Sequence, residues 1–364
     1  MKRFIACIAG LTMLLAGSVG LSRGVELKLD PRKALVPIEE IMSGGPPPDG
    51  IPPIDRPRFI SVKEADKWLK DREPVIAFQL QGDHRAYPLQ VLTWHEIVND
   101  LVGGKPVAIT FCPLCASALV FSREYKGKEY DFGTSGMLYK SNLVMYDRQT
   151  KSLWAQITGQ AIVGDLAGAK LKQYPAAIVS WGQWKKAYPQ GKVLSRQTGY
   201  RRPYGRNPYV GYDRIDKPPF LFRGKLDGRL LPMERVAAIR LGKVYKAYPF
   251  RVLAKKRVVN DLVNGQPLVV FYTPGTASAL DEAEIAASKD VGALGIFDPR
   301  LEGRRLTFRR LRDVFVDEQT GSSWDILGRA KNGPLKGKAL ARLTYLDTFW
   351  FAWAAFQPET IIFR

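Results

Sequence analysis

Residues 86–119 read AYPLQVLTWHEIVNDLVGGKPVAITFCPLCASAL, and residues 247–280 read AYPFRVLAKKRVVNDLVNGQPLVVFYTPGTASAL. The two stretches align without a gap at an offset of 161, and 17 of the 34 positions are identical. Weaker matches continue at offsets of 170 and 169, pairing Trp154 with Trp324 and Trp181 with Trp350. This self-similarity predicts an internal duplication that gives two homologous lobes.

Each copy mixes strand and helix patterns. Residues 75–80 and 85–89 flank a Gly-Asp turn and predict a hairpin, and residues 107–111 predict a short buried strand. Apolar positions within residues 91–102 have helical spacing, and residues 180–188 predict a short helix. Proline and glycine are frequent, so hairpins should outnumber helices. We therefore expect a β-rich α+β fold.

The N-terminus has the pattern of an export signal. Lys2 and Arg3 precede an apolar run over residues 4–15, and small residues that suit cleavage follow. An uncleaved membrane anchor is the less favoured alternative, because the run is short for a membrane span. No later stretch is apolar enough to cross a membrane, so we expect a periplasmic or secreted protein. The expected order is a signal peptide (residues 1–22), an extended Pro/Gly-rich collar (23–66), lobe one (67–196), a linker (197–224) and lobe two (225–364).

Composition and charge limit the classes of function. The chain is 46% hydrophobic and 25% charged, as in folded globular proteins. Its formal net charge of +20 is spread along the sequence, and no nucleic-acid recognition motif accompanies it. A solvated basic surface is therefore the favoured interpretation. The alternative is binding to an anionic cell-envelope surface, and an exported protein is not expected to bind nucleic acid.

The second copy serves as an internal control for the first, because residues kept in both copies are expected to support the shared fold. Three differences coincide in lobe two: His95 is replaced by Lys256, Cys112 by Thr273 and Cys115 by Thr276. The remaining cysteine, Cys7, falls within the predicted signal. A bridge closing so small a loop would stabilise little, so a chemical role is expected for the pair in lobe one.

The first hypothesis is a soft-metal site made by Cys112, Cys115 and His95. A Cys-Pro-Leu-Cys turn can direct two thiolates at one ion, and an imidazole would complete a set that suits copper or zinc. Met145 could add a thioether and favour copper, whereas Glu96 could add a carboxylate and favour zinc. Such a centre would serve metal handling or metal-dependent redox chemistry.

Two alternatives stay open beside the metal hypothesis. The CxxC pair could perform thiol–disulfide exchange, with Cys112 and Cys115 as the catalytic residues, although a strand and not a helix is expected after it. The chain could also be a non-catalytic, basic cell-surface binding module. Lobe one has a further stretch that lobe two lacks, and it supplies the pocket candidates Ser135, Tyr139, Asn142, Asp147 and Arg148.

Long motifs of this chain are similar to those of a known family. They are SGGPPPDGIPPIDRPRF (residues 43–59), AYPLQVLTWHEIVND, FCPLCASALVF and GTSGMLYKSNLVMYDRQTKSLWAQ. Together they resemble a bacterial and archaeal family catalogued as domain of unknown function three-one-seven-nine. The resemblance runs from about residue 35 to the end of the chain and includes His95, Cys112 and Cys115. It implies no particular activity.

Overall fold

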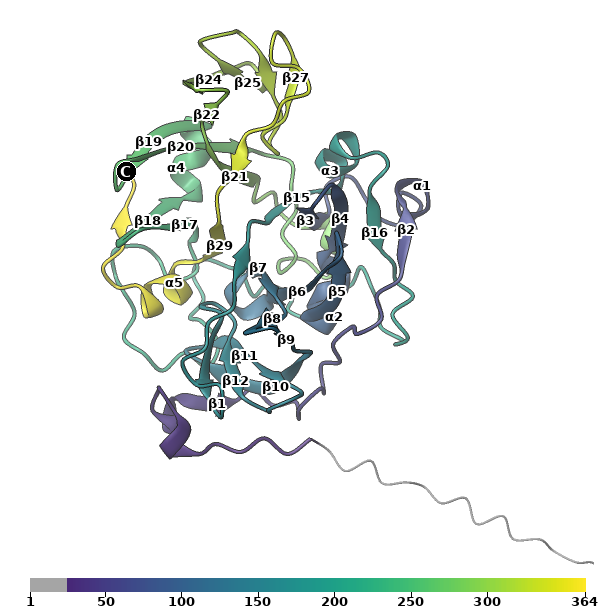
Figure 1. Cartoon of the computed structure of the whole chain (residues 1–364), viewed down its shortest axis with the longest axis vertical. Coiled ribbons are helices and arrows are strands. Elements are labelled where there is room, and N and C mark those ends of the chain that lie inside the picture. Colours follow the sequence, from purple (N-terminus) through teal and green to yellow (C-terminus); the bar gives the residue numbers. More distant parts are fainter. Residues whose placement is uncertain (1–24) are drawn as a thin grey trace, which may run out of the picture.

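The computed structural model describes residues 25–364, so the predicted signal peptide lies outside the described residues. Within them, many short strands and five short α-helices form the β-rich α+β fold that the sequence predicts (Figure 1). None of these helices combines the length and the apolar character that crossing a bilayer requires.

Three main sheets form around lobe one and the collar. Each is built largely from antiparallel neighbours, as expected for strands joined by tight turns. Their strand orders, with bounds, are β15 (Ala177–Ser180), β3 (Pro74–Leu80), β4 (Asp83–Pro88), β16 (Lys192–Leu194) and β2 (Phe59–Ser61); β14 (Gln173–Tyr174), β7 (Ser117–Ser122), β6 (Lys105–Cys112) and β5 (Ile97–Val102); and β1 (Ile41–Ser43), β10 (Phe132–Tyr139), β11 (Asn142–Asp147), β12 (Leu153–Ala155) and β13 (Gln160–Val163). A small hairpin joins β8 (Glu124–Tyr125) to β9 (Lys128–Glu129), and the helical elements are η1 (Pro31–Lys33), η2 (Ile38–Glu40), α1 (Val62–Ala65), α2 (Leu89–His95), η3 (Pro113–Cys115) and α3 (Trp181–Ala187).

Lobe two has three sheets in a related order. They are β29 (Tyr345–Phe349), β17 (Arg235–Leu241), β18 (Val244–Pro249) and β30 (Ile361–Ile362); β19 (Val258–Val263), β20 (Gln266–Thr273), β21 (Ala293–Asp298) and β28 (Ala341–Arg342); and β24 (Phe308–Leu311), β25 (Val314–Asp317), β26 (Ser323–Trp324) and β27 (Ala330–Asn332). The other elements are α4 (Phe250–Lys256), η4 (Ile285–Ala287), α5 (Trp350–Phe356) and the small hairpin of β22 (Arg300–Leu301) and β23 (Arg304–Arg305).

The hairpin predicted from residues 75–89 forms as β3 and β4, and the helix predicted at residues 180–188 forms as α3. The helix predicted over residues 91–102 is wrong in its second part, because α2 ends at His95 and residues 97–102 form β5. Glu96 has a φ of 58°, which stops the helix and turns the chain into the strand. The full ladder from β5 to β6 then outweighs the helical spacing of a few apolar side chains.

Two side-chain hydrogen bonds occur at equivalent positions of both lobes. In each lobe a Tyr hydroxyl donates to an Asp carboxylate, at 2.5 Å in lobe one and 2.7 Å in lobe two. In each lobe a Trp Nε1 also donates to an Asp carboxylate, at 2.9 Å in both. The four pairs are Tyr87–Asp100, Tyr248–Asp261, Trp154–Asp147 and Trp324–Asp317.

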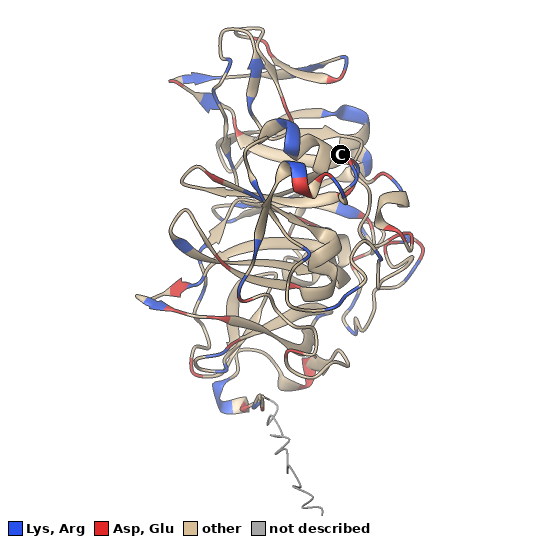
Figure 2. Cartoon of the chain, turned by 90° about the vertical axis from the view of Figure 1, so that its right-hand side faces the viewer, with Lys and Arg blue, Asp and Glu red and all other residues tan. Residues whose placement is uncertain are grey.

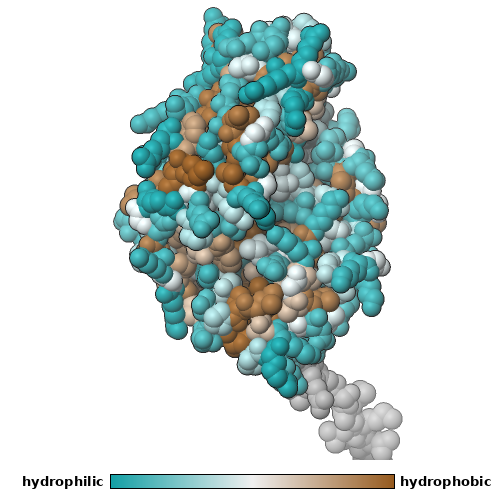
Figure 3. Space-filling view, turned by 60° about the vertical axis from the view of Figure 1, so that its left-hand side comes forward, coloured by the Kyte–Doolittle hydropathy of each residue, from teal (hydrophilic) through white to brown (hydrophobic). Residues whose placement is uncertain are grey.

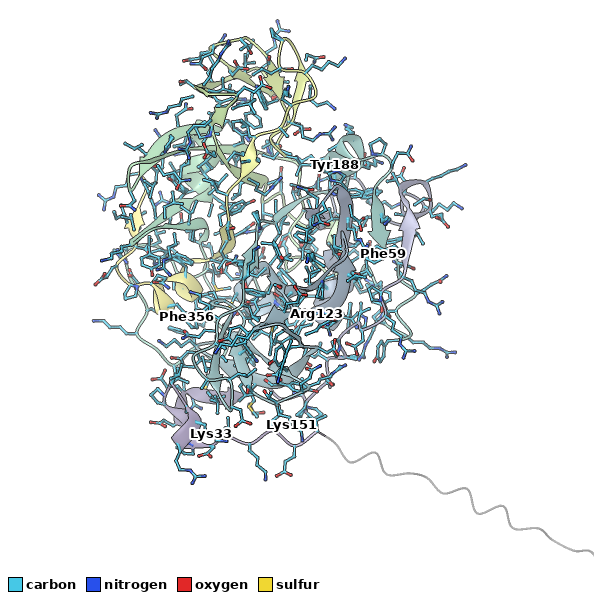
Figure 4. All side chains as sticks on the ribbon, viewed as in Figure 1. Lys33, Phe59, Arg123, Lys151, Tyr188 and Phe356 are labelled. Atoms are coloured by element: carbon cyan, nitrogen blue, oxygen red, sulfur yellow. The ribbon has the colours of Figure 1, made fainter. Side chains whose placement is uncertain are left out.

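The lobes are packed together and do not have separate cores. One apolar cluster includes Phe111 of lobe one and Phe349 of lobe two, and a second includes Trp184 and Phe271. Tyr188 directly follows α3 and is labelled in Figure 4, and the guanidinium of Arg329 from lobe two lies 4.8 Å from its ring centroid. Buried apolar surface therefore holds the lobes in a fixed relation.

Residues 44–58 of the collar contain no helix or strand, and they lie against lobe one. Ile54 donates its backbone N–H to Ile97 and accepts one from Asn99, which ties the collar to β5. Asp49 accepts the N–H of Thr134 from β10. These contacts anchor the collar without a regular strand, since proline lacks the N–H that a ladder needs.

The surface carries its charge in a dispersed way. Figure 2 has Lys and Arg from one end of the molecule to the other, interspersed with Asp and Glu. The face in Figure 3 has separate apolar patches within a largely hydrophilic surface. The dispersed pattern agrees with the expectation that the basic residues are spread along the sequence.

Candidate functional site

The two cysteines lie at the tip of the hairpin formed by β6 and β7. Cys112 ends β6 opposite Ser117, and η3 carries the chain around the turn between them. Pro113 suits the first position of η3 because its φ is fixed and its missing N–H is not needed there. Ala116, with a φ of 52°, ends the turn. Both thiols are free and fully buried.

The Cys112 sulfur receives several donors. Burial alone would raise the pKa of its thiol. The Cys115 thiol and the backbone N–H groups of Leu143, Cys115 and Leu114 outweigh burial and hold the pKa of Cys112 below its ordinary value. The N–H of Leu143 lies 3.4 Å from the sulfur. N–H groups at the start of a helical turn stabilise a thiolate in this way.

The Cys115 sulfur has the opposite character. Burial and the hydrogen bond that it shares with Cys112 raise the pKa of the Cys115 thiol well above its ordinary value. Its sulfur lies 3.5 Å from the Ser141 carbonyl and 3.5 Å from the Asn142 side-chain amide. The pair therefore consists of one sulfur suited to be a thiolate and one suited to keep its proton.

Glu96 adds a buried carboxyl to the same environment. It follows α2 directly, and its side chain is buried beneath the segment that carries Tyr209. Burial and the negative charge on Cys112 raise the pKa of Glu96 to about 8. The carboxyl is therefore largely protonated at neutral pH, and its pKa depends on the charge of Cys112.

A network of buried polar side chains lies behind Cys115. Asn142 donates to Gln156 at 3.0 Å, and Ser117 donates to the same Gln156 oxygen at 3.1 Å. The Gln156 amide nitrogen in turn donates to the hydroxyl of Thr110 at 3.0 Å. Since all these groups are satisfied, the network holds Asn142 in place against the Cys115 sulfur.

The linker covers the dithiol. The Tyr212 hydroxyl donates to the Leu114 carbonyl at 3.0 Å, and the backbone N–H of Phe220 donates to that hydroxyl at 3.3 Å. The Ser141 hydroxyl donates to the Phe220 carbonyl. On the other side, Thr348 of lobe two donates to the Cys115 carbonyl at 2.8 Å. A reaction partner therefore reaches the sulfurs only when the linker moves.

His95 has other partners than the thiols. Its Nδ1 lies 2.7 Å from the Pro52 carbonyl, and its Nε2 lies 2.6 Å from the Tyr204 hydroxyl. The carbonyl is an acceptor only, so Nδ1 carries the proton and Nε2 accepts from the tyrosine. Burial lowers the pKa of His95 to about 4, and Arg202 acts in the same direction. Both ring nitrogens are thus engaged in holding the collar and the linker to lobe one.

The three predicted ligands are not brought together. Across residues 25–364, no three His, Cys, Asp or Glu side chains form a group that could hold a metal ion. As they stand, the residues do not fit a Cys2His centre, because the imidazole has no free nitrogen for an ion. Met145 is buried in the same apolar cluster as the two cysteines.

The other pocket candidates divide between the site and the scaffold. Asn142 alone contacts a cysteine, through its amide. Ser135 donates to the Val144 carbonyl within its own hairpin, and Tyr139 packs edge-on against Phe356. Asp147 accepts from Thr150 and Trp154 as its counterpart Asp317 does in lobe two, and Arg148 pairs with Asp49 and Asp55 of the collar.

Several residues around the dithiol are absent from the sequence-based set. The comparison of the two copies could have found Thr110 and Gln156, because lobe two has Phe271 and Ile326 at those positions. The same comparison could not find Tyr212, because the linker occurs once and has no counterpart.

Comparison with known proteins places the chain in a family. No curated protein and no solved structure matches it. A family model described as "Protein of unknown function (DUF3179)" matches residues 48–360, which include the collar from Pro48 on, both lobes and the dithiol. The resemblance noted in the sequence motifs is thereby confirmed, and the chain belongs to the DUF3179 family.

Proposed function

We propose that this chain is an exported thiol–disulfide oxidoreductase that acts through Cys112 and Cys115. The observation that carries the proposal is the opposed environment of the two sulfurs. Backbone N–H groups and the neighbouring thiol lower the pKa of Cys112, whereas burial raises that of Cys115. Dithiol enzymes need this asymmetry, because one sulfur must attack as a thiolate while the other waits as a thiol.

The first half-reaction starts with Cys112 as the thiolate and with Cys115 and Glu96 protonated. The Cys112 sulfur attacks one sulfur of a substrate disulfide, R–S–S–R′. The bond between the substrate sulfurs breaks, and its electron pair leaves on R′–S⁻, which takes the proton of the Glu96 carboxyl. The product is a mixed disulfide between Cys112 and R, and Glu96 is now a carboxylate.

The second half-reaction uses the other thiol. Cys115 gives its proton to the Glu96 carboxylate, and its sulfur attacks Cys112. The mixed disulfide breaks, R–S⁻ leaves with the electron pair, and it takes the proton back from Glu96. The substrate disulfide has gained two electrons and two protons as two thiols, and Cys112 and Cys115 are joined as a disulfide. The reverse sequence oxidises a substrate dithiol.

Binding of Cu(I) by the two thiolates is the second candidate. It is favoured by the adjacency of two sulfurs that share a hydrogen bond in an apolar surrounding that includes Met145. Soft sulfur ligands suit this ion better than zinc, which prefers four ligands. In this form of the metal hypothesis His95 is not a ligand. A basic cell-surface binding module, without chemistry at the thiols, is the third possibility.

Lobe two is proposed to be a scaffold that arose by duplication of lobe one. The repeated motif and the two side-chain hydrogen bonds that occur in both lobes support a common origin. Thr348 of lobe two supports the dithiol turn through the Cys115 carbonyl. The export signal predicted at residues 1–22 would bring the dithiol to a compartment where protein disulfides form.

The proposal is tested by reacting purified, reduced protein with oxidised glutathione and weighing the products by mass spectrometry. Wild type should form the Cys112–Cys115 disulfide and release two molecules of reduced glutathione. The Cys115→Ser variant should retain one glutathione on Cys112, and the Cys112→Ser variant should react at least tenfold more slowly. Circular dichroism checks that each variant is folded.

Metal analysis of the same preparations distinguishes the second candidate. Stoichiometric copper or zinc that copurifies with wild type and is lost in Cys112→Ser would replace the redox proposal. The redox proposal would also be rejected if, in folded wild type, neither thiol reacted faster than the whole chain unfolds.

A further inference from the structure

A cavity of about 240 Å³ lies in lobe two at the position that corresponds to the dithiol in lobe one. Most of its lining residues come from the end of β20 and from the hairpin of β24 and β25, elements that Figure 1 labels. The side chains that line it and that matter here are Arg257, Tyr272, Thr273, Arg310, Asp313 and Phe315. The cavity is separate from the dithiol, and arginines and aromatic rings line it instead of thiols.

Backbone hydrogen bonds establish that the two positions correspond. Glu96 donates its N–H to Leu92 and accepts the N–H of Phe111. Arg257 donates its N–H to Leu253 and accepts the N–H of Tyr272 in the same way. A buried acid in lobe one is therefore replaced by a base in lobe two, and the Cys112 thiol by the Thr273 hydroxyl.

The exposure of the two positions differs. Glu96 and Cys112 are buried beneath the linker, whereas Arg257 and Thr273 are partly exposed. Tyr209 and Tyr212 of the linker cover the dithiol. Their hydroxyls donate to Glu96 and to the Leu114 carbonyl of lobe one. A small molecule can therefore reach the lobe-two position without a change in the linker.

The side chains that line the cavity carry two positive charges, on Arg257 and Arg310, and one negative charge, on Asp313. Nη1 of Arg257 is buried and has no hydrogen-bond partner in the part of the chain that the structure describes. The Arg310 guanidinium donates to Asp313, whose side chain is 94% exposed. The nearby Asp290 carboxylate, which does not line the cavity, accepts the N–H groups of Gly275 and Thr276. The Arg257 side chain as a whole lines the cavity and is partly exposed, and a guanidinium that lacks a full set of acceptors suits an oxyanion, which it can bind with two parallel hydrogen bonds.

Aromatic rings form the rest of the wall. Phe315 stacks on Phe271 with 4.2 Å between ring centroids, which fixes its orientation. The Arg257 guanidinium lies 5.5 Å from the centroid of Tyr272. Such a wall suits a flat organic group next to the charged end of a ligand.

We infer that this cavity binds a small organic oxyanion, with a carboxylate or phosphate on Arg257 and a flat apolar part against Phe315 and Tyr272. The size of the cavity limits the ligand to a single ring or a short chain. The inference is independent of the dithiol, because no group of the redox site takes part in it.

The test is calorimetric titration of the reduced mature chain with benzoate, phenyl phosphate, inorganic phosphate and the neutral analogue benzamide, at low salt. At least one of the two aromatic anions should bind more tightly than benzamide. Their relative affinities, compared with that of inorganic phosphate, decide whether the site prefers a carboxylate or a phosphate. Arg257→Gln should weaken binding at least tenfold, and Arg310→Gln should weaken it less.

The matched control is Arg309→Gln, which removes an exposed charge of the same strand outside the cavity and should leave affinity unchanged. Melting temperatures establish that the variants are folded, and Cys112→Ser should bind as wild type does. The inference is overturned if neither aromatic anion binds better than benzamide at millimolar concentration. It is equally overturned if folded Arg257→Gln binds as tightly as wild type.

Discussion

Glu96 and Arg257 occupy the same place in the two lobes although their side chains have opposite charge. Each directly follows its helix, with φ of 58° for Glu96 and 65° for Arg257. The backbone conformation is therefore the same at the two positions, whereas the chemistry of the side chain differs. In lobe one the acid is buried next to a thiolate, and in lobe two the base lines an open cavity.

Replacing Glu96 by Gln should change how stability depends on pH. Burial and the Cys112 charge raise the pKa of Glu96 to about 8 in the folded chain, against an ordinary 4.5. The folded state thus holds this proton more tightly than the unfolded state does. The stability that the proton contributes is fully present below pH 4.5 and is lost as pH rises toward 8. Across that pH range, the free energy of unfolding of wild type should fall by on the order of a few kcal/mol relative to that of Glu96→Gln.

Urea unfolding of reduced protein at several pH values measures this difference. Glu234, a buried acid of lobe two that pairs with Arg251, provides the control substitution Glu234→Gln. Parallel pH dependences of wild type and Glu96→Gln would contradict the assignment.

Removing the Tyr212 hydroxyl should make the dithiol more accessible. Tyr212→Phe loses the bonds to Leu114 and Phe220, and each is worth about 1 kcal/mol. Opening of the linker becomes more frequent by roughly five- to thirtyfold, since 1.4 kcal/mol corresponds to a factor of ten. Alkylation of Cys112 by iodoacetamide in the native protein should accelerate by the same factor.

The matched control for this experiment is Tyr200→Phe, because Tyr200 is an exposed tyrosine of the same linker. Its alkylation rate should equal that of wild type. If both variants react at the wild-type rate, the linker does not limit access.

His95→Phe should destabilise the fold by about 2 kcal/mol at neutral pH. The ring volume is kept, but the Pro52 carbonyl and the Tyr204 hydroxyl lose their buried partner. Burial lowers the pKa of His95 to about 4 from its ordinary 6.5, so wild type loses stability as pH falls from 6.5 to 4. The variant should lack this dependence.

Thermal unfolding between pH 4 and 7 measures both effects. Lys256→Ala, at the exposed equivalent position in lobe two, should cost less than about 0.5 kcal/mol. An unchanged pH dependence in His95→Phe would show that the ring is not held as described.

Asp147→Ala and Asp317→Ala should destabilise the protein to a similar extent. Each carboxylate accepts from a buried Trp Nε1 and from a Thr, with distances that agree between the lobes. Each substitution should cost roughly 2–4 kcal/mol, because several donors lose their acceptor. Equilibrium unfolding in urea gives the two values. A large loss of thiol reactivity in folded Asp147→Ala, absent from Asp317→Ala, would instead assign Asp147 to the site.

Much of the fold was predictable because its signals are local. The Gly-Asp turn between residues 75–80 and 85–89 predicted the hairpin of β3 and β4, and the apolar residues 107–111 before Cys112 predicted β6. The error at residues 97–102 has a physical cause. Ile97, Val98 and Leu101 fit the spacing of a helix, and only the ladder to β6 determines that they form a strand.

The sequence by itself determined that the thiols occur in one lobe and that lobe two has Thr273 and Thr276 instead. This conclusion needs only the two aligned stretches, since two similar stretches in one chain can be compared position by position. The tertiary structure decided the partners: His95 faces Pro52 and Tyr204, whereas Glu96, Asn142 and Tyr212 surround the dithiol. Contacts of this kind depend on how distant segments pack, and the periodicity of a sequence records which residues are buried but not against what.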